Sequence, residues 1–227
     1  MPDSAPPATS IFAALPADLS EQLFRRVHRI RLKADHMLFF AGDPGDGCYR
    51  IDEGLLKVTV GSASGAERIV AILGPGEMVG ELAMIDGLPR STSVGAIRDS
   101  VVSFISRADF QSVAERSPDI FRHIALMLAE RLRNANAVVA AASFLSLKGR
   151  VARALLSLAD AFGRDVGSGR TVIRHKISQS DLAAMVGIAR ENVSRILNDW
   201  KRLGLISQLS GYYCVEKSAE LAREAQL

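Results

Sequence analysis

The chain has 227 residues, of which 48% are hydrophobic and 23% are charged, and its formal net charge at pH 7 is +3. These values are typical of a soluble globular protein, and the length is sufficient for two ordinary domains. No apolar run is long enough to span a membrane, and residues 1–10 lack the basic and apolar regions of a signal peptide. We therefore expect a cytoplasmic protein with no membrane partner.

The charge is unevenly distributed along the chain. Residues 1–145 contain 15 Lys and Arg against 17 Asp and Glu, a net charge of −2, whereas residues 146–215 contain 11 against 5, a net charge of +6. A strongly basic segment is typical of a polyanion-binding surface. The second part of the chain is therefore the candidate nucleic-acid binder.

The N-terminal segment is expected to contribute little beyond packing. Residues 1–10 are rich in Pro and Ala and predict a disordered tail. In residues 11–27, Leu15, Leu19, Leu23 and Val27 recur every four positions, which predicts one or two short helices.

Residues 31–105 consist of short apolar runs that are separated by turn residues. Turn signals occur at 42–47, 53–54, 62–65, 74–77 and 86–87, and the strand candidates include 55–60, 68–73 and 101–106. Turns at intervals of eight to twelve residues are typical of an antiparallel barrel or jelly roll.

This segment does not contain the residues of a metal or covalent-catalysis site. His36 is its single histidine, and the two cysteines of the chain, Cys48 and Cys214, are far apart in sequence. We therefore expect no bound metal, free thiols and no enzymatic activity, with a jelly-roll enzyme as a remote alternative.

Residues 79–93 carry the functional signal of this segment. Gly80 permits close backbone approach, and residues 81–83 would open a helical turn whose free N–H groups suit an anion. Arg90 adds a cation with forked donors, and Ser91 adds a hydroxyl. Glu81 beside Arg90 suits a ligand that offers both a phosphate and hydroxyl groups; the alternative is a structural ion pair around a tight turn.

A long helix is predicted over residues 117–146. Ser117 is a suitable N-cap before Pro118, and no Pro or Gly follows until Gly149. One apolar stripe recurs at three- or four-residue spacing: Ile124, Leu128, Leu132, Ala135, Val139 and Ala142. The many alanines around it favour a close helix contact with a second copy of the chain over burial in a core.

These features together resemble a known family. Gly80-Glu81-Leu82-Ala83, followed by Pro89-Arg90-Ser91-Thr92, is similar to the phosphate-binding cassette of cyclic nucleotide-binding domains. With the long helix after it, the chain resembles the CRP/FNR family of bacterial transcription factors. The resemblance implies a cyclic nucleotide held by Gly80, Glu81, Leu82, Ala83, Arg90, Ser91 and, across the dimer, Asn136.

The resemblance also raises the question of which base is read. In the cyclic AMP-binding members, adjacent hydroxyl or amide side chains on the dimer helix reach the purine, and here the matching residues are Ala135 and Asn136. Because Ala135 has no polar side chain, the choice of base stays open. The resemblance implies cyclic AMP as the first choice of ligand, and the alternatives are cyclic GMP, weak discrimination between the two, or an altered response. The iron–sulfur branch is disfavoured because its N-terminal cysteine cluster is missing.

The basic segment contains a helix-turn-helix pattern. Ser146 is expected to cap a helix reaching Phe162, and residues 163–169 form a polar loop, which the resemblance implies can contact RNA polymerase. Ser178 with Asp181 three residues later predicts a helix start, and Gly187 allows a sharp turn before a second helix from about Arg190.

The second helix has a polar face suited to DNA. Arg190, Glu191, Ser194 and Arg195 share one side, opposite Val193 and Ile196. Arg can bind guanine through two hydrogen bonds and Glu can accept one from cytosine, so this face fits a G·C-containing major groove. The less specific alternative is a solvated charged surface.

By resemblance, this helix implies a palindrome with TGTGA-like half-sites, and Ser178, Gln179 and Ser180 imply contacts with backbone phosphates. Ala189 lacks a capping hydroxyl. Residues 203–206 and 211–215 predict the two strands of a wing.

We thus predict an α+β protein with three parts: a cyclic nucleotide-binding jelly roll over 1–116, a dimerisation helix over 117–145 and a winged helix-turn-helix over 146–227. Its predicted function is a homodimeric, cyclic nucleotide-responsive regulator that binds double-stranded DNA. The alternative of the same fold binds DNA constitutively.

Overall fold

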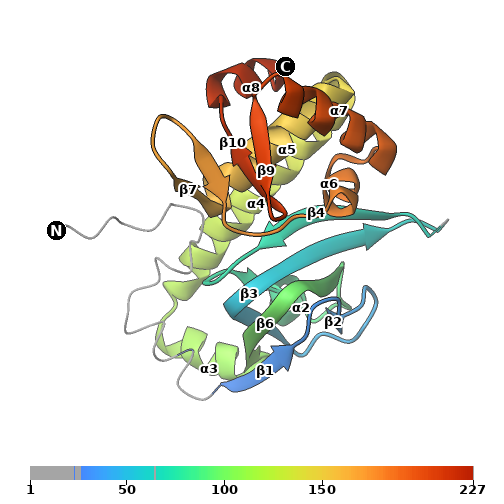
Figure 1. Ribbon diagram of the computed structural model, residues 1–227. Coiled ribbons are helices and arrows are strands. Elements are labelled where there is room, and N and C mark those ends of the chain that lie inside the picture. The colour runs from blue at the N-terminus through green and yellow to red at the C-terminus, as the bar shows by residue number, and fades with distance from the viewer. Residues whose placement is uncertain (1–22, 24–26, 64, 227) are drawn as a thin grey trace. The chain divides into compact units, whose positions relative to one another are not determined.

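The computed structural model describes residues 23, 27–63 and 65–226 (Figure 1). The chain divides into two compact units, Met1–Arg133 and Asn134–Leu227. The tail predicted for 1–10 lies outside the described residues, as do most of the helices predicted within 11–27. Leu23, which is described, is helical and buried.

The first unit is built on an antiparallel six-stranded sheet. Its strands are β1 (His28–Leu32), β2 (Met37–Phe39), β3 (Gly47–Gly61), β4 (Glu67–Leu73), β5 (Met78–Val79) and β6 (Ser93–Ser106). The main order is β1-β6-β3-β4, while β2 pairs with β6 and β5 with β3. Ile51, Leu56 and Val102 are completely buried in one apolar cluster of this sheet, as the short apolar runs predicted.

The turn predicted at residues 53–54 is wrong, because β3 runs through this point. Gly54 has a φ of 100°, and the pairing of β3 with β6 is irregular around it. A Cβ at this position would collide with Ser100, whose hydroxyl accepts a hydrogen bond from the Leu55 N–H at 3.1 Å. Glycine therefore permits a local bulge in a continuous strand.

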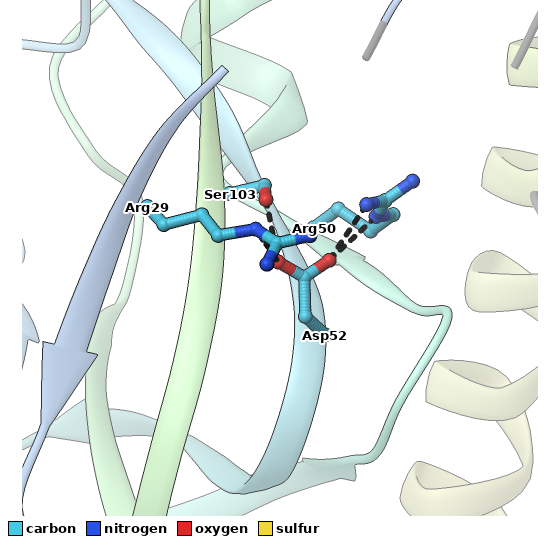
Figure 2. Close-up of polar contacts among 4 residues, drawn as sticks. All are labelled: Arg29, Arg50, Asp52 and Ser103. Atoms are coloured by element: carbon cyan, nitrogen blue, oxygen red, sulfur yellow. Dashed lines mark hydrogen bonds and ion pairs between the residues drawn. The ribbon is translucent and has the colours of Figure 1, made fainter. Parts of the chain in front are cut away.

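A mostly buried carboxylate, that of Asp52, ties three strands together (Figure 2). Asp52 on β3 accepts hydrogen bonds from Arg50 at 2.7 and 2.9 Å and from the Ser103 hydroxyl on β6 at 2.5 Å. Arg29 on β1 approaches the same carboxylate at 3.8 Å, and the strand register places Arg29 and Arg50 on either side of Ser103. Figure 2 shows the Asp52 carboxylate between the two guanidinium groups.

Replacing Asp52 with Ala should lower the free energy of unfolding by about 1–3 kcal/mol, because it removes the acceptor of the fully buried Ser103 hydroxyl. Urea denaturation monitored by circular dichroism would measure the change. Asp99→Ala is the matched control, since Asp99 pairs with Lys33 on the open surface and its loss should matter little. Equal effects of the two substitutions would contradict a structural role for the Asp52 cluster.

Among the elements whose bounds the structure describes, three helices belong wholly or partly to the first unit: α2 (Glu81–Asp86), α3 (Arg107–Arg116) and α4 (Ile120–Phe144). The boundary between the units falls within α4. The predicted start of the long helix at Pro118 is wrong. Ser117 instead ends α3, donating its N–H to the Val113 carbonyl at 2.9 Å, and α4 begins at Ile120. Capping preference alone could not distinguish the end of one helix from the start of the next.

The second unit combines helices with a four-stranded sheet. Its elements after α4 are α5 (Leu147–Phe162), β7 (Gly163–Asp165), β8 (Thr171–Ile173), α6 (Gln179–Val186), α7 (Arg190–Arg202), β9 (Ile206–Leu209), β10 (Tyr212–Val215) and α8 (Ser218–Glu224). The sheet order is β7-β8-β10-β9. Leu182, Leu197 and Trp200 are buried in this unit.

The helix predictions in this unit are confirmed, whereas one loop prediction and one strand prediction need correction. Ser146 caps α5 by accepting from the Gly149 N–H at 3.1 Å. Residues 163–169, predicted as a loop, begin a hairpin formed by β7 and β8. The first wing strand begins at Ile206 rather than at 203, because Leu203 caps α7 and Gly204 turns the chain with a φ of 65°. Among the described residues, no helix is both long and apolar enough to cross a bilayer.

Candidate functional site

The segment from Gly80 to Arg90 forms a compact backbone cradle in the first unit. Gly80 caps α2 with a φ of 82° and without a side-chain bond. A Cβ at this position would collide with the Arg90 guanidinium, so glycine is needed both for the backbone angle and for space. The Arg90 backbone is held by the 40–43 loop: its N–H donates to the Asp43 carbonyl and its carbonyl accepts from Gly42, both at 2.8 Å.

Arg90 is a buried cation that is only partly satisfied. One terminal nitrogen donates to the carbonyls of Gly47 at 2.6 Å and Gly80 at 2.8 Å. The guanidinium carbon lies 4.5 Å from the centre of the Phe39 ring. Within the described structure the Nε–H has no hydrogen-bond partner, and the paired carboxylate, Asp46, is 3.9 Å away and 82% exposed. Such a group is suited to binding an anion.

Glu81 is also buried, and its partner was not predicted. Its carboxylate forms an ion pair with Arg131 of α4, and Arg131 also donates to the Met78 carbonyl. The prediction for this helix rested on its apolar stripe, and Arg131 lies beside that stripe. The one sequence signal for a role of Arg131 in the site is its position next to Leu132 of the apolar stripe.

The other predicted ligand contacts are distributed as follows. Ala83 is buried beneath the cradle, whereas Leu82 and Ser91 are exposed. Ala135 and Asn136 are exposed on the part of α4 that belongs to the second unit. The structure thus brings Gly80, Glu81 and Arg90 together, and the contact of Asn136 across a dimer stays a prediction.

The described residues contain no group of three or more His, Cys, Asp or Glu that could hold a metal ion. Cys48 is fully buried with its sulfur 3.2 Å from that of Met84. Burial raises the pKa of the Cys48 thiol well above its usual range, so it remains protonated. Cys214 is likewise a buried free thiol.

The helix-turn-helix has the predicted local chemistry. The Ser178 hydroxyl accepts from the Asp181 N–H at 3.0 Å and caps α6. Gly187 ends α6 with a φ of 68°, donating its N–H to the Ala183 carbonyl at 2.8 Å. Ala189 precedes α7 without a side-chain cap, as its lack of a hydroxyl predicted.

The exposed side of α7 borders a hollow. Val193, Ile196 and Trp200 are buried, whereas Arg190 and Arg195 point into solvent. The hollow has a volume of about 510 Å³ and is lined by Gln179, Arg190, Glu191, Ser194, Arg195, Asn198 and Asp199. Ser178 and Ser180 are exposed at the start of α6 outside this lining.

Asn198 and Asp199 were missed by the sequence analysis. Each lies four residues after a predicted DNA contact, Ser194 or Arg195, so helical periodicity could have found both. Asp199 pairs with Arg202 on the same helix. The exposed face of α7 therefore combines arginines, carboxylates and amides and is not a uniformly basic patch.

Two family models match this chain, one within each of its two units. Residues 29–117 match the family model of the cyclic nucleotide-binding domain, and residues 149–224 match that of the Crp-like helix-turn-helix domain. A CRP-like cAMP-activated global transcriptional regulator from Mycobacterium tuberculosis is 32% identical over 216 residues, which cover 95% of this chain and 96% of the relative.

Solved structures show the same fold. FixK2 from Bradyrhizobium japonicum matches with a TM-score of 0.80 at 19% identity, covering 89% of this chain and 98% of its own. The c-di-GMP responsive global regulator CLP from Xanthomonas campestris matches with a TM-score of 0.74 at 24% identity, covering 88% and 99%. The chain therefore belongs to the CRP/FNR family of transcription regulators, which join a cyclic nucleotide-binding domain to a DNA-binding helix-turn-helix, and not to a family of enzymes.

Proposed function

We propose that this protein is a homodimeric transcription regulator that binds cyclic AMP at Arg90 and then binds a palindrome with TGTGA-like half-sites more tightly. The observation that carries the proposal is the buried guanidinium of Arg90, whose Nε–H has no hydrogen-bond partner in the described structure. A cyclic phosphate would supply the missing acceptor and a compensating charge. The cyclic AMP-activated relative supports the choice of nucleotide.

The remaining ligand contacts follow from the same cradle. Glu81 would accept a hydrogen bond from the ribose hydroxyl, Ser91 would donate to the phosphate, and the backbone of residues 80–83 would complete the site. Asn136 would reach the base from the partner subunit. Arg131 already holds the Glu81 carboxylate, so we add it to the site as the residue that orients this acceptor.

A second candidate is constitutive DNA binding. It is favoured by the two hydrogen bonds that Arg90 already makes to backbone carbonyls and by the existing pair of Glu81 with Arg131, because both show that the cradle holds itself together as structure. Calorimetric titration of the nucleotide-free protein with cyclic AMP, cyclic GMP and cyclic di-GMP distinguishes the candidates. Tight binding of cyclic AMP alone supports the proposal; binding of none of the three favours the constitutive alternative.

The regulatory step is proposed to act through the dimer. Ligand that contacts the cassette of one subunit and Asn136 of the other would favour one arrangement of the two α4 helices and so the spacing of the two α7 helices. A shift from mostly inactive to mostly active needs roughly 5.5 kcal/mol of differential affinity. The protein would act in the cytoplasm on double-stranded DNA, with RNA polymerase as a further partner.

Replacing Arg190 with Ala should relax the choice of base at one position in each half-site, at a cost of about 1–3 kcal/mol for the preferred base pair. Competition binding with a set of singly substituted palindromes would locate that position. Arg164→Ala is the matched control, because Arg164 is exposed on β7 and carries the same charge. An unchanged base preference in the Arg190 variant would exclude Arg190 as a reader of sequence.

A further inference from the structure

Two arginines lie against the glycines at the two ends of α2. The Arg90 guanidinium packs on Gly80, which precedes the helix, and the Arg107 guanidinium packs on Gly87, which ends it. Arg107 is the first residue of α3, and it is not among the proposed contacts with the nucleotide. The arrangement indicates that each end of this short helix is held by a cation from outside it.

The Arg107 side chain covers the C-terminal end of α2. A Cβ on Gly87 would lie 2.1 Å from one of its terminal nitrogens, and the other terminal nitrogen donates to the Ile85 carbonyl at 3.4 Å. The last carbonyls of a helix have no partner within it, and none of the described residues in the last turn of α2 is basic. Arg107 therefore supplies from α3 the cationic donor that this helix end lacks.

The position of the Arg107 guanidinium is energetically unfavourable in one respect. Within the described structure its Nε–H is buried and has no hydrogen-bond partner. A methionine would fill a similar space without burying an unpaired donor. Packing alone therefore does not explain an arginine at this position, and its contact with the end of α2 requires a further explanation.

Arg107 and Arg90 are anchored to the same short segment of the chain. The Arg107 backbone N–H donates to the Asp46 carbonyl at 2.7 Å, and the next carbonyl, that of Gly47, accepts from Arg90 at 2.6 Å. This segment also packs against α2, because a Cβ on Gly45 would lie 2.1 Å from a side-chain atom of that helix. Residues 45–47 are thus a common base from which the two arginines reach the two ends of α2.

We propose that Arg107 is a positioning residue for nucleotide binding, which fixes the C-terminal end of α2 and thereby holds Glu81 in place to accept from the ribose. Glu81 is the first residue of α2, and a helix of six residues has fewer than two turns, so a shift of one end also moves the other. Arg107 itself does not contact the ligand. The inference rests on the proposed binding of a cyclic nucleotide, and it does not depend on which base or DNA sequence the protein prefers.

The test combines nucleotide affinity with amide hydrogen exchange in the full-length Arg107→Met protein. Calorimetric titration well below the thermal midpoint should show cyclic AMP affinity about three- to tenfold lower than that of the wild type, as expected for the loss of one hydrogen bond. Amides of residues 81–87 should exchange faster in the nucleotide-free variant, whereas those of β3 and β6 should be unchanged, because only α2 is released. The thermal midpoint should change little, since the substitution also removes an unpaired buried donor.

Two other substitutions separate positioning from packing. Arg116→Leu is the matched control: Arg116 lies on the same helix, its guanidinium bonds to Ser112 of that helix, and its loss changes the net charge equally. Nucleotide affinity and exchange of α2 should then equal those of the wild type. Arg107→Lys keeps a cationic donor for the Ile85 carbonyl and should recover part of the lost affinity, which a side chain that only fills space would not do.

Unchanged exchange of α2 in the Arg107→Met protein would overturn the proposal. Faster exchange with an affinity within twofold of the wild type would overturn it too, because Arg107 would then be only structural. A wild-type protein that binds no cyclic nucleotide would instead contradict the proposed ligand. The exchange measurement would still decide in that case whether Arg107 fixes α2, since it needs no ligand.

Discussion

Replacing Arg90 with Leu is expected to weaken cyclic AMP binding by about two orders of magnitude or more, because it removes the charged partner of a desolvated phosphate. The protein should remain folded. Leu leaves the carbonyls of Gly47 and Gly80 without their donor, but it also removes a buried charge with an unpaired N–H, and these two effects oppose each other. Calorimetric titration measures the affinity, and denaturation of the same samples measures the fold.

Two further variants make the result specific. Arg98→Leu is the matched control, because Arg98 is exposed on β6 and its loss changes the net charge equally. Arg90→Lys keeps the charge but loses the forked donors, so its affinity should fall between those of the wild type and Arg90→Leu. Nucleotide affinity of Arg90→Leu within a few-fold of the wild type would mean that the buried arginine is only structural.

The double variant Leu132→Asp and Val139→Asp is expected to be monomeric, with DNA affinity lower by about two to four orders of magnitude because the two half-sites are no longer bound by one linked pair of domains. Leu132 and Val139 lie one heptad apart on α4 and are 63% and 65% exposed in the single chain. An exposed apolar stripe on a helix of 25 residues is best explained by a second copy of the same helix, and two carboxylates in that contact would be desolvated without partners.

Sedimentation equilibrium distinguishes the states, since the chain mass is 24.4 kDa and a dimer has twice this value. Val70→Asp with Val166→Asp is the control: these side chains are 41% and 43% exposed and belong to β4 and to the segment between β7 and β8, and this variant carries the same added charge. The expected result is a dimer for the control and a monomer for the α4 variant. A dimeric α4 variant would show that subunits associate through another surface.

The elements with local chemical signals were predictable from sequence. The caps at Ser146 and Ser178, the turn at Gly187 and the buried side of α7 all depend on residues within one or two turns of each other. The fold class and the family were predicted correctly for the same reason, because the cassette and the helix-turn-helix are contiguous motifs.

The failures involve partners that are distant in sequence. Gly54 indicates a turn in the sequence, and only its contact with Ser100 on β6 explains a glycine within a strand. Strand β8 of the β7–β8 hairpin pairs with β10, which is distant in sequence. The ion pair of Glu81 with Arg131 joins residues 50 positions apart. No spacing rule connects such positions, because the packing of the sheet and of the middle of α4 brings them together.

The buried state of Arg90 also could not be foreseen. The sequence predicted a cation at the cassette, but its stacking on Phe39 comes from β2, and its hydrogen bonds go to the carbonyls of Gly47 at the start of β3 and of Gly80 before α2. These contacts convert a surface arginine into a desolvated one. A phosphate contact is stronger in that environment than in water.

The measurement that tests the account most directly is the affinity of the purified protein for a TGTGA-type palindrome with and without saturating cyclic AMP, together with the affinity for cyclic AMP with and without that DNA. The nucleotide should tighten DNA binding about 5- to 150-fold, and the DNA should tighten nucleotide binding by the same factor, because the coupling is reciprocal. Equal DNA affinity in both states would contradict the proposed switch, even if the nucleotide and the DNA each bind.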